Sequence, residues 1–370
     1  MTSPIPDSTN TAISVRWSTE IGAMMHVTAE QLLWFILVGV LWAGYFFLEG
    51  FDFGVGILLP FIGRNDPERR ALINCIGPIW DGNEVWVIVA IGATFAAFPL
   101  WYSEMLSNLY LLFFTVIVAL ILRGVAFEWR GKRDSARWRR NFDLAIFIGS
   151  ALPAFLWGLL FGDLIKGVPL TASGTVVGGI SGIVTPYALL TGLTTLAVFT
   201  LHGSVFLSLK VGGYLRGRVN AYVRRIAPVT ALVLFVYLSI TYLIARSDGH
   251  SGDVPGMIPV AALVLIVAVT WLSRERLFGW AFVATGAAIL ALTATVFMTL
   301  YPDTIMSSIR PALSLSITRA ASQPYTLNVM TIVAAIFTPL VLVYQAWTYW
   351  IFRKRIEVPR NTNSEPEQVR

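Results

Sequence analysis

The chain has 370 residues, of which 56% are hydrophobic and only 13% are charged, and its mean hydropathy is +0.70. So little charge excludes an ordinary soluble domain. We interpret the net charge of +6 as a sign of membrane topology and of contact with anionic lipid, and not of nucleic-acid binding. The single cysteine, Cys75, excludes an internal disulfide and a cysteine-held iron–sulfur cluster, and we expect it to be a small buried residue. The composition therefore predicts an all-α polytopic membrane protein.

Uncharged runs long enough to cross about 30 Å of hydrocarbon, for which about 20 residues suffice, predict nine transmembrane helices. They are Gln31–Leu48, Val85–Ser103, Met105–Leu122, Leu144–Gly162, a run within 167–209, Ile226–Ala245, Val254–Ser273, Leu277–Pro302 and a run within 320–352. Residues 1–29 precede them as an N-terminal extension that lacks the features of a cleaved signal peptide. Residues 353–370 follow as a polar tail that we expect to be disordered.

The Lys and Arg residues predict the orientation of these helices. Of the 27 in the chain, 22 lie in alternate joints (after the first, third, fifth and seventh helices) and in the C-terminal tail, and five lie on the other side. Cytoplasmic loops carry an excess of Lys and Arg. The N-terminus is therefore expected outside and the C-terminus in the cytoplasm, which requires an odd number of spans.

Four carboxylates lie in two short motifs that are fused to apolar runs. Glu49 and Asp52 belong to LEGFDFGVG, and Asp81 and Glu84 belong to WDGNEVW. Nineteen residues separate Glu30 from Glu49, which corresponds to about 28 Å of helix. The four acids are therefore expected in one layer near the cytoplasmic rim. Because ionisable groups are costly in a membrane and usually functional, we expect this layer to handle protons or cations.

Two structural alternatives compete with that role. Asp81 stands near a helix start, where it would serve as an N-cap or as a first-turn acid favoured by the helix dipole. Glu49 and Asp52 would be interfacial groups that reach for water, although the glycines around them favour contact with a neighbouring helix. Arg123 and Glu128 share the expected depth, which suggests that they pair with the acids.

The chain has one histidine within a predicted span, His202, because His26 precedes the first helix and His250 lies in an outer loop. Haem is usually held by His, Met or Cys. A lone imidazole in TLHGSVF is more often hydrogen-bonded between helices. We therefore expect no haem-binding and no metal-binding residue in this chain.

Several segments resemble subunit II of cytochrome bd-type quinol oxidases. The run GFDFGVGILLPFIGRNDPERRALINCIGPIWDGNEVW is similar to the N-terminal signature of that family. RWRRNFDLAIFIGSALPAFLWGLLFG, TLHGSVFLSLKVGG and SLSITRAASQPYTLNVM resemble later family segments and occur in the same order. The resemblance covers about residues 30 to 352.

The resemblance implies two four-helix bundles and one peripheral helix. Helices 1 to 4 would occupy residues 30–163, and an outer loop with helices 5 to 8 would occupy residues 164–302. A second outer loop and helix 9 would follow in residues 303–352.

The resemblance also implies a haem-bearing partner, subunit I. That subunit would hold the quinol site, two b-type haems and one haem d or a third b-type haem, with no cofactor and no catalytic residue in the present chain. The complex would oxidise quinol and reduce oxygen to water in a bacterial or archaeal cell membrane, surrounded by lipid. A small single-helix subunit and a structural quinone are further partners that the resemblance leaves open.

In this family the Asp of the WDGN motif is implicated in proton entry, and that residue is Asp81 here. The resemblance thus makes Asp81 the leading relay residue, with Glu84, Asp52 and Glu49 as its neighbours. A tryptophan near an oxygen route in some members corresponds to Trp86. A proton-coupled secondary transporter is the alternative function, although such proteins tend to place their charges at the membrane midplane.

Overall fold

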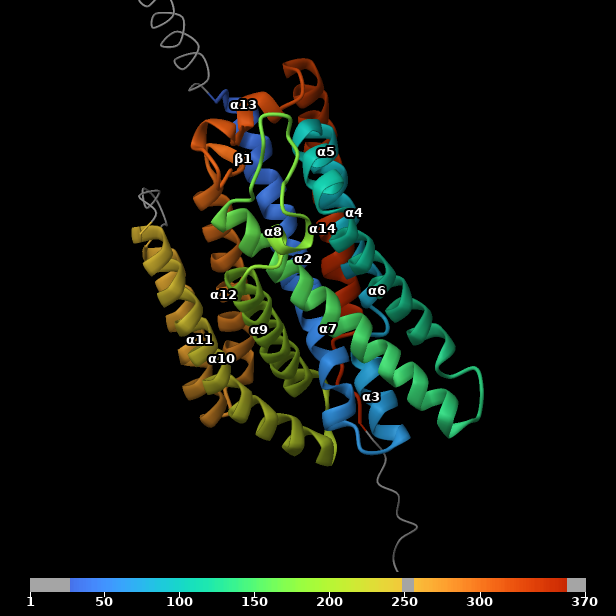
Figure 1. Cartoon of the computed structure of the whole chain (residues 1–370). Coiled ribbons are helices and arrows are strands. Elements are labelled where there is room, and N and C mark those ends of the chain that lie inside the picture. The colour runs from blue at the N-terminus through green and yellow to red at the C-terminus, as the bar shows by residue number, and fades with distance from the viewer. Residues whose placement is uncertain (1–26, 248–255, 358–370) are drawn as a thin grey trace, which may run out of the picture.

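The computed structural model describes residues 27–247 and 256–357, and most of them are helical (Figure 1). The long helices are α2 (Ala29–Ile62), α4 (Trp80–Ala97), α6 (Tyr110–Trp129), α7 (Ala136–Lys166), α9 (Pro186–Lys210), α10 (Gly213–Ser247), α11 (Met257–Arg274), α12 (Phe278–Leu300) and α14 (Pro324–Ile351). Short elements connect them: α3 (Asp66–Ile76), α5 (Pro99–Asn108), α8 (Gly179–Ile183), β1 (Asp303–Ile305), η1 (Pro311–Leu313), β2 (Leu315–Ser316) and α13 (Ile317–Ala320). Strands β1 and β2 pair antiparallel. Residues 1–25, His26, His250 and the end of the polar tail lie outside the described residues.

Helix α2 is the centre of the molecule, and it packs against α4, α7, α9 and α12 (Figure 1). Thr28 caps its N-terminus in a capping box with Gln31. The predicted first span ended at Leu48, but the helix continues to Ile62. Glu49 and Asp52 therefore lie within a continuous helix, surrounded by other helices.

The backbones of α2 and α9 touch where they cross. A Cβ atom on Gly54 would lie 2.1 Å from the carbonyl oxygen of Phe199, and one on Gly203 would lie 2.5 Å from Gly54. Only glycine on both helices permits this approach. The contact brings the first group of helices, α2 with α4, α6 and α7, directly against the second group, α9 to α12.

The predicted second span differs from the structure. We expected one helix over Val85–Ser103, but α4 starts earlier, at Trp80, and ends at Ala97, and α5 follows at an angle of 119°. Pro99 has no backbone N–H to donate and fixes its own φ, which suits the first position of α5, where the N–H would have no partner within the helix. In the described part of the chain, eight helices are long and apolar enough to span a membrane, or nine if the bent pair is one span.

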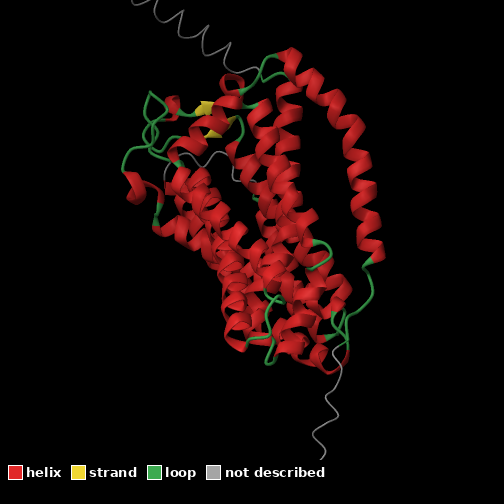
Figure 2. Ribbon diagram, turned by 90° about the vertical axis from the view of Figure 1, so that its right-hand side faces the viewer, coloured by secondary structure: helices red, strands yellow, loops and turns green. Residues whose placement is uncertain are grey.

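Helix α14 stands apart from the other helices over most of its length (Figure 2). Leu327 is its buried residue, and its other apolar side chains are largely exposed. Two polar contacts hold its ends. Near its start Trp34 Nε1 donates to the Leu327 carbonyl and the Thr331 hydroxyl, both at 3.0 Å. Near its end Gln345 and Tyr349 bind Asn83.

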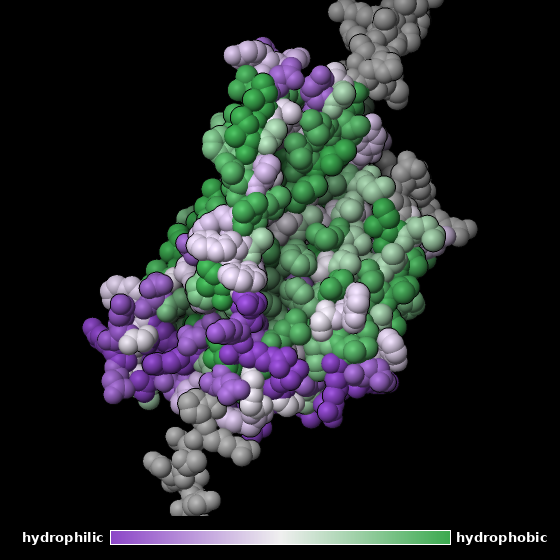
Figure 3. Space-filling view, turned by 180° about the vertical axis from the view of Figure 1, so that it is seen from behind, coloured by the Kyte–Doolittle hydropathy of each residue, from purple (hydrophilic) through white to green (hydrophobic). Residues whose placement is uncertain are grey.

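Alternate joints and the last described residues meet at one end of the molecule, opposite residue 27 (Figure 1). A space-filling view shows hydrophilic residues gathered at this end below a broad apolar band (Figure 3). Exposed cations there include Arg70, Arg133, Arg274, Arg276 and Lys354. The described joints to which the charge count assigned most of the cations thus lie at one end of the fold.

At this end the short helix α3 joins the two groups of helices. Its Glu68 pairs with Arg218 of α10 at 2.5 Å, and its Arg69 pairs with Asp143 of α7 at 2.8 Å. Cys75 of the same helix is buried, as expected, and its Sγ donates to the Ala71 carbonyl. Burial raises the pKa of the Cys75 thiol to about 12, so the thiol is not a reactive group at neutral pH.

Candidate functional site

Three helices bring charged side chains together in the interior of the first group of helices. Arg123 of α6 forms an ion pair with Glu49 of α2, and its Nη2 atom lies 3.4 Å from Glu84 Oε2 of α4. The side chains of Arg123 and Glu49 are 0% exposed, and that of Glu84 is 18% exposed. One guanidinium thus bridges a fully buried carboxylate and one that still reaches the surface of the chain.

Aromatic rings complete the surroundings of Arg123. Its Cζ atom lies 4.7 Å from the centre of the Phe53 ring and 5.8 Å from that of Phe127. A cation over the face of a ring is attracted by the ring quadrupole, and most strongly where water is excluded. The rings therefore help to stabilise a cation that would otherwise be costly to bury.

Asp52 lies one turn beyond Glu49 and has a different kind of partner. The Asn83 amide of α4 donates from Nδ2 to Asp52 Oδ2 at 2.7 Å. The Asn83 Oδ1 atom in turn accepts hydrogen bonds from Gln345 Nε2 at 3.0 Å and from the Tyr349 hydroxyl at 2.7 Å. Helix α14 therefore reaches the buried acids through one amide.

Glu49 and Asp52 are both 0% exposed, so the alternative that they are interfacial groups reaching for water is wrong within this chain. Glu84 is confirmed as their neighbour. We refer to Glu49, Asp52, Glu84 and Arg123 as the charged cluster. It places three carboxylates around one cation, which is an arrangement able to accept and release protons.

Asp81 does not join the charged cluster directly. It lies exposed in the first turn of α4, and among the described residues it makes no hydrogen bond or ion pair. The N-cap of α4 is Ile79, which makes no side-chain capping bond, so Asp81 is not the N-cap, but it is an acid in the first turn, as the other half of that alternative has it. It precedes Glu84 by three residues on α4, a spacing that puts two side chains on the same face of a helix.

Sequence reasoning found the acids but only part of their surroundings. The pairing of Arg123 with them is confirmed, whereas Glu128 lies exposed and forms no ion pair among the described residues. Asn83, Gln345 and Tyr349 were not predicted. Asn83 is part of the WDGN motif, which was a usable signal, whereas the two α14 residues stand more than 260 positions along the chain from it.

Trp86 lies half-buried between α4 and α2. A Cβ atom on Gly44 would lie 2.3 Å from the Trp86 ring, so the glycine makes room for the indole. The ring packs against the apolar residues that surround α2. Trp86 thus lies at the contact between α4 and α2, two residues after Glu84 in the sequence.

His202 is buried in α9 and uses both ring nitrogens. Nδ1 lies 2.7 Å from the Thr285 hydroxyl of α12, and Nε2 donates to the Phe47 carbonyl of α2 at 3.2 Å. The imidazole also stacks on Phe282, with ring centres 4.7 Å apart. The prediction that His202 is hydrogen-bonded between helices is confirmed, and these contacts do not fit a haem ligand.

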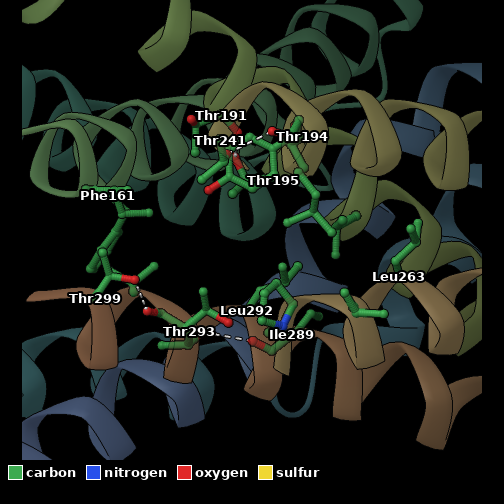
Figure 4. Close-up of a pocket in the computed structure, with 18 of the residues that line it drawn as sticks. Phe161, Thr191, Thr194, Thr195, Thr241, Leu263, Ile289, Leu292, Thr293 and Thr299 are labelled. Carbon is green, nitrogen blue, oxygen red and sulfur yellow. Dashed lines mark hydrogen bonds between the residues drawn. The ribbon is translucent and has the colours of Figure 1, made fainter. Parts of the chain in front are cut away.

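A cavity of about 640 Å³ lies among the helices of the second group and is bordered by α7 and by Phe46 of α2 (Figure 4). Its wall combines apolar side chains such as Phe161 and Leu292 with threonines from facing helices. Several threonine hydroxyls are satisfied within their own helices, since Thr194 donates to the Leu190 carbonyl and Thr293 to the Ile289 carbonyl, whereas Thr195 also donates to the Ala154 carbonyl of α7. No charged side chain of the described residues lines this cavity, which suits an apolar molecule.

A broad apolar band formed by many long helices is typical of a polytopic membrane protein. Comparison with known proteins gives the family. The family model described as cytochrome bd terminal oxidase subunit II matches residues 30–352. The chain belongs to this family, and it is therefore a subunit of a cytochrome bd quinol oxidase, a respiratory oxidoreductase whose haems the family implies in a partner subunit.

Individual relatives agree with the family. The chain is 40% identical to cytochrome bd ubiquinol oxidase subunit 2 of Bacillus subtilis over 88% of its length and 96% of that protein. It is 34% identical to cytochrome bd-I ubiquinol oxidase subunit 2 of Escherichia coli over 92% of its length and 100% of that protein. The fold is similar to that of a chain in the bd oxidase from Geobacillus thermodenitrificans, with a TM-score of 0.69 at 17% identity, covering 88% of this chain and 99% of that chain.

Proposed function

We propose that this chain scaffolds the haem-bearing subunit I and delivers protons to it from the cytoplasm. Reduction of oxygen to water consumes protons at a buried site, which requires a protonatable route through the protein. The observation that carries the proposal is the charged cluster, which links Glu84, still partly exposed, to the fully buried Glu49 and Asp52. Asp81 supplies an exposed carboxylate beside Glu84.

The route would run inward from the rim. Asp81 would collect a proton at the surface, Glu84 would receive it, and Glu49 with Asp52 would hold it in the interior. Arg123 would keep Glu49 and Glu84 close together, since its guanidinium contacts both. Each acid takes part by gaining and losing a proton, and no redox centre in this chain is required.

The orientation is part of the proposal. Nine spans, with the bent pair α4 and α5 counted as one, would place residue 27 outside and residue 357 in the cytoplasm of a bacterial or archaeal cell. The hydrophilic end in Figure 3 supports this, because the cations of alternate joints gather there. The charged cluster would then lie toward the cytoplasmic rim, where protons are taken up, and the helix groups would form the two bundles and the peripheral helix.

The variant Asp81→Asn tests the relay. We expect complexes with normal haem content and quinol-driven oxygen consumption that is slower by about tenfold. This is less than the 10²–10⁴ typical of a proton-transfer group, because water also reaches Glu84. Asp134→Asn is the matched control, since Asp134 is 98% exposed and pairs with Arg139 in the joint before α7. Wild-type respiration of Asp81→Asn would rule out the relay role.

Trp86 is proposed to border a route for oxygen between α2 and α4. Trp86→Ala would open the space that the indole fills beside Gly44. We expect a two- to threefold change in the apparent oxygen affinity, roughly the effect of 0.5 kcal/mol, measured by high-resolution respirometry at limiting oxygen. A loss of haem without a change in oxygen affinity would show that Trp86 is structural.

The remaining partners follow from the same role. Subunit I would supply the quinol site and the haems, a structural quinone would occupy the cavity between α9 and α12, and a small single-helix subunit would add to the complex. The visible spectrum of the purified complex separates this function from a secondary transporter. Oxidase-type haem bands with a co-purifying larger subunit are expected, and a colourless protein active alone would contradict them.

A further inference from the structure

Asp52 differs from the other two acids of the charged cluster in lacking a cation. Glu49 and Glu84 both contact Arg123, whereas Asp52 is bound through the neutral amide of Asn83. Asp52 is 0% exposed. A buried carboxylate without a paired cation costs several kcal/mol, and such a group is neutralised by a proton instead.

The groups that face Asp52 strengthen this argument. Glu49, one turn away on α2, and Glu84 of α4 oppose a negative charge on Asp52, while Arg123 of α6 favours it. Tyr349 of α14 is the other titratable group nearby. Three carboxylates around one guanidinium leave an excess of negative charge, and Arg123 already serves the other two.

The amide of Asn83 decides which oxygen of Asp52 carries the proton. Gln345 and Tyr349 both donate to Asn83 Oδ1, which turns its NH₂ group toward Asp52 Oδ2 at 2.7 Å. Oδ2 therefore accepts a hydrogen bond. Oδ1 makes no hydrogen bond to any described residue, so a proton on it is not held by a neighbouring group.

We propose that Asp52 is the member of the charged cluster that holds a proton at rest, on Oδ1, and that Asn83, Gln345 and Tyr349 are the positioning residues that fix this arrangement. The proposal rests on the proposed proton-delivery function and names its resting proton. It gives the peripheral helix α14 a role, because two of its residues set the amide that orients Asp52. Transfer moves only the proton, from Asp52 Oδ1 to an acceptor carboxylate.

Infrared spectroscopy of the purified complex tests the proposal. The carbonyl stretch of a protonated carboxylic acid shifts in D₂O, and ¹³C-carboxyl labelling of aspartate shifts it only if the acid is Asp. We expect a labelled band in the wild type that is lost in Asp52→Asn and retained in Glu49→Gln and in Asp163→Asn, the control at another buried aspartate. A labelled spectrum that is unchanged in Asp52→Asn, or the loss of the same band in Glu49→Gln, overturns the proposal.

Variants of α14 test the positioning role and keep the proposal falsifiable if Asp52→Asn fails to assemble. Tyr349→Phe removes one donor to Asn83 and should shift the frequency of the Asp52 band, and Gln345→Leu combined with it should shift the band further. Tyr344→Phe is the matched control, because Tyr344 is exposed on the same helix. An unchanged band in Tyr349→Phe and in the double variant overturns the positioning role.

The two proposals fail separately. If Asp81→Asn respires normally while the Asp52 band behaves as expected, proton delivery through Asp81 is wrong and the resting proton remains. If Asp81→Asn slows respiration but Asp52→Asn leaves the labelled spectrum unchanged, proton delivery through Asp81 is supported and the resting proton lies on another residue.

Discussion

The two groups of helices bury different kinds of polar side chain. Between α2, α4 and α6 the interior holds ionisable groups, of which Glu49, Asp52 and Arg123 are fully buried. Between α9 and α12 it holds hydroxyls, the neutral contacts of His202 and a cavity whose described lining residues carry no charge.

The difference lies in where each polar group finds its partner. A threonine such as Thr293 donates to a carbonyl of its own helix, so it needs nothing from a neighbour. Glu49 and Asp52 depend on Arg123 and Asn83, which come from other helices. The first group of helices therefore depends on charged side chains that are paired across helices, while the second group is joined by neutral contacts such as that of His202 with Thr285.

Arg123→Met tests how strongly the first group of helices depends on its charged pairs, and it should have the largest effect. The variant leaves Glu49 buried without a cation, which costs about 3–5 kcal/mol when one partner of a buried pair is removed. We expect the largest fall in the yield and thermal stability of the complex among the variants considered. The measurement is the thermal unfolding midpoint of the detergent-purified complex, with its haem content.

Two further variants identify the cause of that loss. Arg133→Met is the control, since Arg133 is exposed and stacks on Trp138. Adding Glu49→Gln to Arg123→Met removes the unpaired charge and should recover part of the stability. If the double variant is less stable than Arg123→Met, the unpaired Glu49 is not the cause.

Much of this fold was predictable because a span needs only a long apolar run. The runs that became α7, α9, α11, α12 and α14 were found by composition alone. The extension of α2 past Leu48 was not, because the helix carries its charges into contacts with other helices. The break before Pro99 was missed because the apolar run continues through it, although the proline was a signal.

The charged cluster was predictable in its acids and not in its connections. Apolar surroundings make Glu49 and Asp52 conspicuous, and shared depth suggested Arg123. Depth does not say which side chains touch, so Asp81 and Glu84 looked equivalent although Asp81 is exposed. Contacts such as that between Asn83 and Tyr349 depend on how α14 packs, which no local pattern encodes.

Glu68→Gln tests the contact between the two groups of helices and has an intermediate effect. Burial alone would raise the pKa of Glu68, but hydrogen bonds from Arg218 and the Arg64 backbone outweigh it and lower the pKa. The ionised form of Glu68 therefore stabilises the fold above the pKa of the unfolded chain, about 4.3. This contribution is lost as the pH falls through the lower pKa of the folded state.

The expected loss in Glu68→Gln is about 1.5 kcal/mol at pH 7, the lower end for a charged hydrogen bond, because Arg218 is partly exposed. Thermal unfolding at pH 7 and pH 4 measures it. The difference between wild type and variant should be smaller at pH 4 than at pH 7. Glu275→Gln, in the exposed joint between α11 and α12, is the control and should have the stability of the wild type at both pH values. A loss of stability in Glu68→Gln that does not change with pH would contradict its ionic origin.

Thr293→Phe tests the second group of helices and should have the smallest effect on stability. The larger side chain would enter the cavity, and the hydroxyl that is lost donates only to a carbonyl of its own helix. We therefore expect the free energy of unfolding to fall by less than about 1 kcal/mol. If the cavity holds a structural quinone, the quinone extracted per complex should fall by more than half, while Thr115→Phe on the exposed face of α6 should leave it unchanged. Unchanged quinone content in Thr293→Phe would place the quinone elsewhere. A loss of stability as large as that of Arg123→Met would mean that the second group of helices depends on its packing as strongly as the first group depends on its charges.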